Sequence, residues 1–323
     1  MFDIAAIGEL LIDFTPYGTN EHGIALFAQN PGGAPANVLA MNTCLGGSSA
    51  FIGKVGQDDF GSFLRNVLEK SKIDVTGLVM TPDVNTTLAF VQLNEYGDRS
   101  FSFYRKPGAD MMLTTNEVKK DIINQCKIFH FGSVSLTDEP CRTATLDSVQ
   151  FAKQQGKIIS YDPNYRAPLW NNPDRAKAEI SQALPLADIL KVSDEEMVFL
   201  TGETVLEKGA VKLAAYGPSV VLVSLGCKGA FYYVNSGFGT LRTYDVEAID
   251  TTGAGDAFFG AVLYQLREMN LEMLKALSQS EWEDIIDFAN AAGSLTTTQK
   301  GAIPAMPALH AIEKCRRTVP LLK

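Results

Sequence analysis

Short apolar, β-branched runs alternate with helical patterns along most of this 323-residue chain. The runs predict strands at residues 4–7, 128–131, 158–161, 188–192 and 220–224. Amphipathic patterns between them predict helices at 141–155, closed by Gly156, and at 173–183. Near-continuous apolar strands separated by helices are typical of a parallel sheet covered on both faces. We therefore expect an α/β fold, a doubly wound, mostly parallel sheet flanked by helices.

Two stretches depart from this rhythm. Residues 86–104 alternate around a turn at 94–98, which predicts a β-hairpin, and residues 13–30 are polar and weakly patterned. We interpret them as parts of a small β-rich lid, formed by about 13–33 and 86–107, on a single domain that spans 1–323. The alternative is two ordinary surface excursions. Further on, Ser280 and Glu283 predict a capping box at the start of a helix.

The overall composition restricts the classes of partner. The formal net charge is −9, which argues against nucleic-acid binding because such proteins rely on basic patches. No apolar stretch approaches the length needed to span a membrane, and the first residues do not resemble a secretion signal. Five cysteines without C-x-x-C pairs fit neither a disulfide framework nor a zinc site. We expect a cytoplasmic protein.

The segment 250–258, Asp-Thr-Thr-Gly-Ala-Gly-Asp-Ala-Phe, carries the strongest chemical signal. Gly253 and Gly255 allow a close backbone approach to a ligand just before a predicted amphipathic helix, and the first N–H groups of a helix bind anions such as phosphate. Asp256 at the same place could act as a fixed base beside that phosphate. An anion site next to a base is what phosphoryl transfer to an alcohol requires. The alternative is a glycine turn that Asp256 merely caps.

A second glycine cluster lies near the amino terminus, at Gly32 and Gly33, and is followed by Asn37, which directly precedes a helix predicted over 38–44. Upstream, Asp13 is predicted to end the first strand, where ligands of open α/β sheets collect. A carboxylate that accepts two hydroxyls is suited to a sugar diol, and Asn37 offers both a donor and an acceptor. Alternatively, Asp13 is a turn residue and Asn37 a helix cap.

Together the two clusters resemble the ribokinase-like, PfkB-type carbohydrate kinase family, whose two signatures match residues 32–61 and 250–258. The resemblance spans the chain and implies a ribokinase-like fold with a β lid that closes over a sugar. It implies ATP-dependent phosphorylation of a primary hydroxyl, with Asp256 as base and the amides of Gly253, Ala254 and Gly255 stabilising the transferred group. In relatives, exposed lid edges often pair, which implies a homodimer.

The resemblance also assigns positions one by one. It implies sugar contacts at Asp13, Gly32, Gly33 and Asn37. It implies nucleotide contacts at Asn164, Ser224, Gly226, Gly229, Gly253, Gly255 and Asn290. It implies a monovalent cation, usually potassium, held around Asp250, Thr252, Thr296, Gln299 and Gly301. Glu196 matches the acidic residue that organises water around Mg²⁺, but Ser193 stands where the family has asparagine. Residues 194–196 also fit a plain acidic first turn of a helix.

Residues 103–110, 160–170 and 191–196 resemble fructokinases within this family, which implies transfer to the 6-hydroxyl of D-fructose. Arg105 and Arg166 are candidate substrate contacts. Related 2-keto-3-deoxygluconate kinases use similarly placed arginines to bind a carboxylate, for which the guanidinium geometry is well suited. The arginine pair therefore leaves a neutral hexose and a sugar acid open. Another PfkB sugar or nucleoside kinase is also an alternative.

Functions from other classes are less consistent with these motifs. The chain has no G-x-x-x-x-G-K-[ST] loop, and the third glycine of a dinucleotide fingerprint is replaced by Phe258. His130 lies inside an apolar run and is predicted to be a core residue. A sugar-binding regulator that lost the chemistry is the non-enzymatic alternative, but the intact glycine loop with Asp256 disfavours it.

Overall fold

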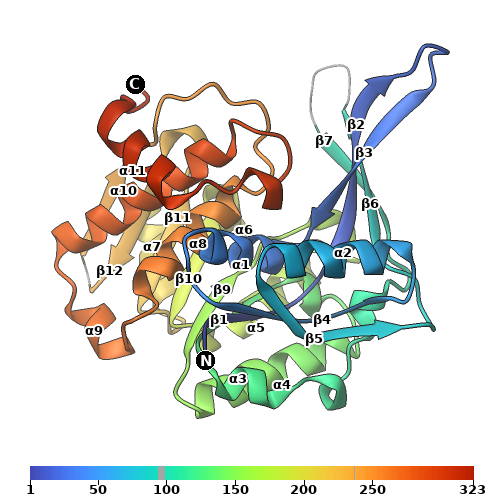
Figure 1. Cartoon of the computed structure of the whole chain (residues 1–323). Helices are drawn as coiled ribbons and strands as arrows, with labels where there is room; N and C mark the ends of the chain where they lie inside the picture. Colours follow the sequence, from blue (N-terminus) through green and yellow to red (C-terminus); the bar gives the residue numbers. More distant parts are fainter. Residues whose placement is uncertain (94–98, 236) are drawn as a thin grey trace.

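A nine-stranded sheet forms the centre of the molecule (Figure 1). The computed structural model describes residues 1–93, 99–235 and 237–323, and within them the strand order is β13-β12-β11-β10-β9-β8-β1-β4-β5. The strands are β1 (Phe2–Ile7), β4 (Ser49–Gly56), β5 (Ile73–Thr81), β8 (Cys126–Gly132), β9 (Ile158–Asp162), β10 (Ile189–Ser193), β11 (Val220–Ser224), β12 (Ala230–Val234) and β13 (Gly237–Leu241). All pair in parallel except β12 and β13. The predicted mostly parallel sheet is confirmed.

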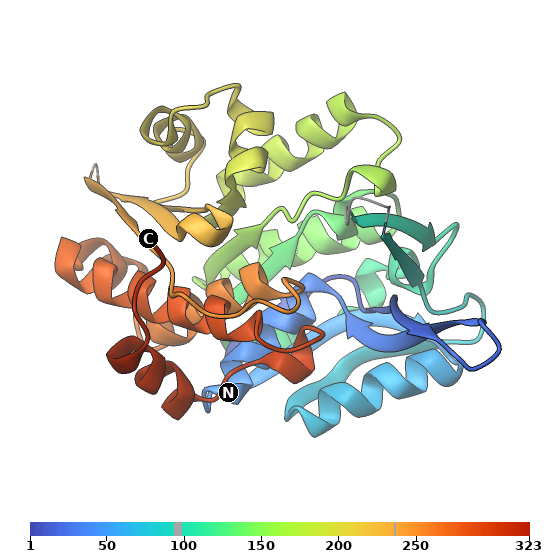
Figure 2. The ribbon, with the colours of Figure 1, turned by 90° about the horizontal axis from the view of Figure 1, so that it is seen from above.

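Helices pack on both faces of this sheet (Figures 1 and 2). One layer contains α1 (Ala34–Cys44), α2 (Asp59–Lys70), α8 (Ala254–Leu266), α9 (Leu271–Ala276), α10 (Gln279–Thr296) and α11 (Leu309–Thr318). The other contains α3 (Lys120–Asn124), α4 (Cys141–Gln154), α5 (Pro173–Ala183), α6 (Asp194–Thr201) and α7 (Leu206–Ala214). The helices predicted at 141–155 and 173–183 therefore exist with nearly the expected bounds.

The two helical layers explain why the strands are apolar throughout. Successive side chains of a strand point to opposite faces. Along β1, Ile4 joins the apolar core beneath α1 and α8, whereas Ala5 joins the core beneath α4, and both are fully buried. His130 of β8 is also fully buried, as its apolar surroundings in the sequence predicted. Its Nδ1 lies 3.0 Å from the Ser160 hydroxyl oxygen.

A second, four-stranded sheet projects from the main body (Figure 1). Its order is β3-β2-β6-β7, with β2 (Leu11–Thr19), β3 (Ala25–Gly32), β6 (Leu88–Leu93) and β7 (Arg99–Tyr104). Both stretches that break the α/β rhythm of the sequence contribute to it. The predicted hairpin turn at 94–98 lies outside the described residues. This small sheet resembles a lid.

Three local predictions are wrong in detail. The first strand ends at Ile7, and Asp13 lies in β2 of the lid. The capping box of α10 is formed by Ser278 and Glu281, two residues before the predicted pair. The helix after the glycine loop, α8, is buried around nearly its whole circumference instead of being amphipathic, because it packs between α1, α10 and the sheet.

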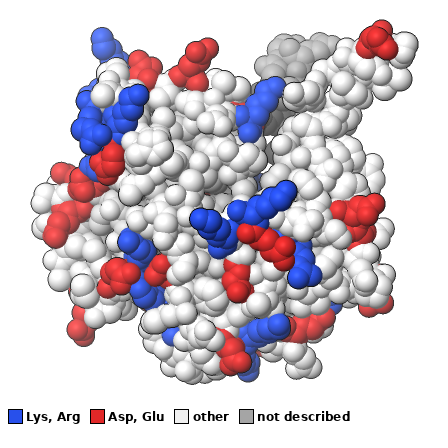
Figure 3. Space-filling view, in the orientation of Figure 1, with Lys and Arg blue, Asp and Glu red and all other residues white. Residues whose placement is uncertain are grey.

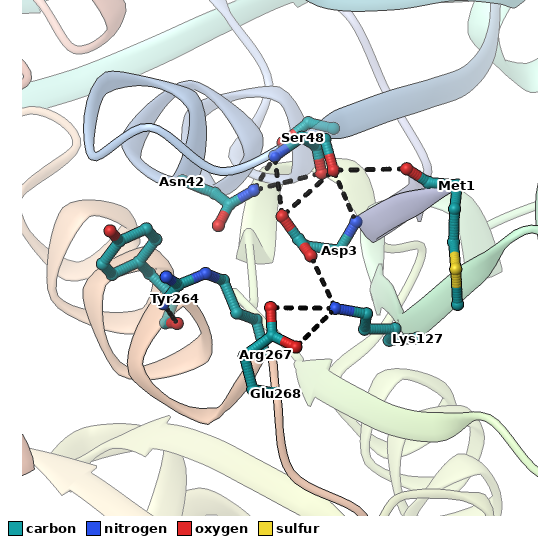
Figure 4. Close-up of polar contacts among 9 residues, drawn as sticks. Met1, Asp3, Asn42, Ser48, Lys127, Tyr264, Arg267 and Glu268 are labelled. Carbon is teal, nitrogen blue, oxygen red and sulfur yellow. Dashed lines mark hydrogen bonds and ion pairs between the residues drawn. The ribbon is translucent and has the colours of Figure 1, made fainter.

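A polar cluster fixes the end of α8 that lies away from the glycine loop (Figure 4). Lys127 at the start of β8 bonds both Asp3 at the start of β1 and Glu268 just after α8. Asp3 also accepts hydrogen bonds from the amide and hydroxyl of Ser48. The helix that carries Asp256 is thus tied to the central strands at its far end.

The surface carries charges of both signs. On the face shown in Figure 3, Lys and Arg side chains are interspersed with Asp and Glu. Among the described residues, no helix combines the length and apolar character needed to cross a membrane.

Candidate active site

A cavity of about 800 Å³ opens at the carboxyl ends of β1, β9 and β10, beside the lid. This is the edge at which open α/β sheets bind their ligands. The predicted site residues that line it are Asp13, Gly33, Asn37, Asn164, Arg166, Glu196, Asp250, Thr252, Gly253, Gly255, Asp256 and Gly301. These residues are far apart in the sequence, and the fold gathers them around one space.

Asp256 lies in the first turn of α8 and is buried, with 7% of its surface exposed. One carboxylate oxygen accepts a hydrogen bond from Asn37 Nδ2 at 2.8 Å, and the other accepts one from Asn164 Nδ2 at 3.4 Å. Burial raises the pKa of Asp256, and the nearby Asp162 carboxylate raises it further. A carboxylate with a raised pKa, held at a helix N-terminus in a cavity, is suited to accept a proton from an alcohol.

The loop before α8 presents backbone amides beside Asp256. Gly253 caps the helix in a left-handed conformation with φ of 76°, which favours glycine. The amide of Ala254 donates to Thr251 at 3.3 Å, so one of the three predicted amides is engaged. Among the hydrogen bonds of the described residues, the amides of Gly255 and Asp256 have no acceptor, which leaves two donors for an anion.

Asn37 does not cap α1, contrary to the alternative considered from the sequence. The helix begins at Ala34, so Asn37 lies in its first turns, and its side chain bonds Asp256. Gly32 leaves room for the neighbouring strand, because a Cβ there would overlap the Asp13 carboxylate. Burial raises the pKa of Asp13 to about 6. Asp13, Asn37 and Asp256 thus line one part of the cavity.

Glu9, which follows β1, is a cavity residue that the sequence did not single out. Its Oε1 accepts the amide of Ala34 at 3.0 Å, at the start of α1, which has no side-chain cap of its own. Its Oε2 is buried and has no hydrogen-bond partner among the described residues. Burial raises the pKa of Glu9 to about 7. A carboxylate in the short connection between β1 and β2 was the available signal.

Lys191 and Asp162 are two further cavity-side residues that sequence reasoning missed. They lie on neighbouring strands β10 and β9, and Lys191 Nζ is 2.8 Å from Asp162 Oδ2. Both side chains are buried. The signal in the sequence was a lysine inside an otherwise apolar strand, since lysine is almost never buried without a partner.

Glu196 and Ser193 form a capping box at the start of α6. The Glu196 carboxylate accepts the amides of Tyr165 at 2.6 Å and Ser193 at 2.7 Å, and the Ser193 hydroxyl accepts the amide of Glu196 at 3.1 Å. Ser193 is thus the N-cap, a role that serine fills well. Burial raises the pKa of Glu196, which lines the cavity.

The predicted nucleotide residues of the β11–β12 turn begin at Ser224, which pairs with the cavity residue Ser193 of β10. Among the described residues, none of Ser224, Gly226, Gly229 and Asn290 lines the cavity. Gly226 and Gly229 both have positive φ, and a Cβ on Gly229 would overlap the carbonyl of Leu241. Asn290 of α10 donates to the carbonyls of Leu241 and Arg242. The turn and Asn290 therefore meet at the end of β13.

The residues predicted to surround a monovalent cation are also brought together. Asp250 accepts the amide and hydroxyl of Thr252 with one oxygen and the amide of Gly301 with the other. The amide of Gln299 donates to the carbonyl of Thr296 at 3.4 Å, and the Thr296 hydroxyl donates to Ala292. Thr297, next to Thr296, accepts the amide of Asp250 through its carbonyl. The segments 250–252 and 296–301 form one polar cluster.

Arg105 does not lie where the sequence analysis placed it. Its guanidinium is buried and forms an ion pair with Asp110 at 2.7 Å. It also donates to the Thr137 hydroxyl and the Val134 carbonyl, and it is not among the described residues that line the cavity. Arg166, by contrast, lines the cavity and is exposed. Of the two arginines considered from the sequence, only Arg166 is among the described residues that line the cavity.

Comparison with known proteins shows the family to which the chain belongs. The family model described as pfkB family carbohydrate kinase matches residues 1–309. The chain is 44% identical to the probable fructokinase-2 of Arabidopsis thaliana over 311 residues, which cover 94% of this chain and 92% of that protein.

Two solved structures are similar over nearly the whole chain. One is a fructokinase from Xylella fastidiosa with bound ATP, with a TM-score of 0.91, 31% identity and coverage of 98% of this chain and 99% of that one. The other is a double-mutant fructokinase from Vibrio cholerae bound to fructose, ADP and a potassium ion, with a TM-score of 0.87, 35% identity and 97% of each chain covered. The chain belongs to the pfkB family of carbohydrate kinases and is a phosphotransferase.

Proposed function

We propose that this protein is an ATP-dependent fructokinase that transfers the γ-phosphoryl group of ATP to the 6-hydroxyl of D-fructose, giving fructose 6-phosphate and ADP. The observation that carries the reaction class is the position of Asp256. It is buried in the first turn of α8, beside two amides that have no acceptor among the described residues, and it is bonded to Asn37 of the neighbouring helix α1. The choice of fructose rests on the fructokinases to which the chain is similar.

In this proposal the cavity binds the sugar between the lid and α1. Asp13 accepts two sugar hydroxyls, while Gly32 and Gly33 allow the backbone to approach and Asn37 orients both the sugar and Asp256. Asp256 then accepts the proton of the 6-hydroxyl as that oxygen bonds to the γ-phosphorus. The amides at the start of α8 stabilise charge on the transferred group. General-base help is worth ~10²–10⁴-fold, so positioning and charge stabilisation supply the rest.

We propose that ATP lies along the adjoining turn, with Ser224, Gly226, Gly229 and Asn290 around the nucleoside and Asn164, Gly253 and Gly255 near its phosphates. Magnesium neutralises the phosphates when it is bound. Among the described residues no cluster of three His, Cys, Asp or Glu side chains is arranged to hold a metal. Both Glu196 oxygens already accept backbone amides, so Glu196 fits a water-mediated role, which Mg²⁺ commonly accepts.

The polar cluster at 250–252 and 296–301 fits a potassium ion. Its Asp250 carboxylate, the threonine hydroxyls and nearby carbonyls supply oxygen ligands, and the cluster adjoins the glycine loop at Gly253. The Vibrio cholerae fructokinase holds potassium together with fructose and ADP. We therefore expect turnover of this protein to increase in potassium over a salt of a larger organic cation at equal ionic strength.

The lid is proposed to close over the sugar and to pair with a second copy. Tyr17, Ile24 and Phe27 on its arm are exposed by 63%, 61% and 43%, and the arm displays few charged side chains (Figure 3). β3 and β7 form the two edges of the lid sheet, and exposed apolar edges invite pairing. Light scattering should report a dimer that Ile24→Lys weakens; a monomer at all concentrations contradicts it.

We place the enzyme in the cytoplasm, which cell fractionation tests.

A 2-keto-3-deoxygluconate kinase is the main alternative. It gains support from Arg166 in the cavity, but the second arginine of that reading, Arg105, is held by Asp110. One exposed arginine is a weak site for a carboxylate, because bidentate binding gains most when the pair is desolvated. The ion pair of Arg105 with Asp110 therefore favours a neutral sugar.

The experiment that tests the proposal is an acceptor panel with ATP: fructose, 2-keto-3-deoxygluconate, ribose, adenosine and inosine, read as ADP release. We expect the highest kcat/KM with fructose. Asp256→Asn should lower kcat by at least ~10²-fold while the affinity for fructose stays within a few-fold. Preference for the sugar acid overturns the substrate assignment, and fructose binding without turnover by the unmodified protein supports the regulatory alternative.

A further inference from the structure

Lys191 is a buried cation at the edge of the cavity that the roles above leave unused. It lies in the middle of β10 with 6% of its surface exposed, and it lines the cavity together with Gly253, Gly255 and Asp256. Taking an ammonium group out of water costs free energy unless a nearby opposite charge compensates for the lost hydration. Asp162 supplies such a charge, so a purely structural ion pair is the simplest explanation to be tested.

The position of the ammonium group points beyond such a pair. Lys191 Nζ lies 3.1 Å from the point that a Cβ on Gly255 would occupy. The absence of a side chain at 255 therefore lets the ammonium approach the first turn of α8. The amides of Gly255 and Asp256, which have no acceptor among the described residues, belong to that same turn.

Lys191 also has donors to spare. A lysine ammonium has three N–H donors and no acceptor. Among the described residues its single hydrogen bond is to Asp162 Oδ2 at 2.8 Å. Two N–H groups thus remain for a ligand in the cavity, and a compact, fixed positive charge is well suited to a phosphoryl oxygen.

The surrounding charges keep this lysine protonated. Burial alone would lower its pKa, but the carboxylates of Asp162, Glu196 and Asp256 together raise the pKa above its ordinary value. Lys191 is thus one cation facing three buried carboxylates. A dianionic phosphoryl group entering this region would meet strong repulsion without it.

We propose that the Lys191 ammonium is a catalytic group that binds the non-bridging oxygens of the phosphoryl group in transit, beside the first turn of α8. This inference rests on the proposed kinase function but not on the identity of the sugar. The acceptor oxygen forms its bond to the γ-phosphorus and loses its proton to Asp256, while the bond to the bridging oxygen breaks and its electrons leave with ADP. Lys191 stays protonated and donates to the charge that builds up on the transferred group.

The test uses Lys191→Met, the neutral pair Lys191→Met/Asp162→Asn, and Lys70→Met, an exposed lysine of α2, as the control. The neutral pair removes both members of the Lys191–Asp162 ion pair together, so it keeps the test usable if the single variant does not fold. For each protein we would measure kcat, KM for the acceptor, the unfolding midpoint, and the affinities for ADP and for ADP with aluminium fluoride, which mimics the group in transit.

We expect both Lys191 variants to lose ~10²–10³-fold in kcat, the range for loss of one donor to a developing anion. The affinity for ADP with aluminium fluoride should fall by a similar factor, while the affinity for ADP alone and KM for the acceptor stay within a few-fold. Recovery of kcat in the neutral pair, or an unchanged preference for the aluminium fluoride complex over ADP, overturns the proposal and leaves a structural ion pair.

Measurements on the unmodified enzyme distinguish a failure of the proposed function from a failure of the proposed role of Lys191. If it phosphorylates another acceptor in place of fructose, the substrate assignment fails and the Lys191 measurements are made with that acceptor. If it phosphorylates no acceptor, the proposed function fails, and selective binding of ADP with aluminium fluoride by the unmodified protein but not by the neutral pair still decides the role of Lys191.

Discussion

Glu9 leads to a prediction about how stability depends on pH. Its carboxyl group is 4% exposed, and Oε2 has no hydrogen-bond partner among the described residues. Burial raises its pKa from the ordinary value of 4.5 to about 7. Each unit corresponds to about 1.4 kcal/mol, so ionising Glu9 in the folded state costs about 3 kcal/mol relative to the unfolded chain.

The sign follows from which state holds the proton. Between pH 4.5 and 7 the folded protein keeps the Glu9 proton that the unfolded chain has lost, so the free energy of unfolding falls as pH rises. Below pH 4.5 both states are protonated and the cost is absent. Above pH 7 both are ionised and the full cost is present.

Glu9→Gln removes this titration and keeps an acceptor for the Ala34 amide. Urea unfolding of both proteins should show the variant gaining about 2–3 kcal/mol over the unmodified protein between pH 5 and pH 8.5. The exposed Glu272→Gln serves as the control, with a constant difference across this range. A difference for Glu9→Gln that stays constant within about 0.5 kcal/mol would refute the reasoning, since it would mean that burial does not penalise the Glu9 carboxylate.

Three further outcomes are expected. Because burial raises the pKa of Asp13 to about 6, its carboxylate should be protonated and lose an acceptor below that pH, so KM for fructose should rise in acid. In Asp13→Asn, KM should be high and independent of pH. A KM of the unmodified enzyme that does not change with pH would contradict this. Gly33→Ala should lower both the unfolding midpoint and the sugar affinity more than Gly46→Ala does. Both positions have positive φ, but only a Cβ at position 33 would overlap the Glu9 carbonyl. Equal effects of the two substitutions would rule out the overlap as the cause. Arg105→Met should lower the free energy of unfolding by ~3–5 kcal/mol, because it leaves Asp110 without its ion-pair partner. The double variant Arg105→Met/Asp110→Asn should recover most of this stability, with KM for fructose within a few-fold of the unmodified value. A large rise in KM in the double variant would restore Arg105 as a sugar contact.

Local patterns in the sequence were sufficient for much of the fold. Strand β11 and helix α5 have the predicted bounds, and the helix of residues 141–155 differs by one residue, because apolar periodicity and Gly156 act within a few residues of where they occur. The segment 250–258 could be singled out as a candidate site for the same reason, since its residues are contiguous. The lid strand that contains Asp13 was harder, because it is polar and gains its order from pairing with β3 and β6.

The contacts that define the site depend on residues far apart in the chain. Asn37 and Asp256 are separated by 219 positions, and Lys191 and Asp162 by 29 positions across two parallel strands. Arg105 is a case in which a partner that is close in the sequence was not recognised. Its partner Asp110 is only five residues away, yet the pattern around it did not reveal that both would be buried away from the cavity.

The alternation of strands and helices, the glycine loop at the start of α8 and the residue types available for chemistry there all follow from short stretches of the chain. Which charged groups are buried, which are paired and which face the cavity depends on the complete fold. The physical reason is that hydrophobic periodicity is a local property of the chain, whereas desolvation and Coulomb interaction depend on every group that folding brings nearby. Lys191 illustrates the difference, because it is an exception within an apolar run in the sequence and a cation beside the glycine loop in the fold.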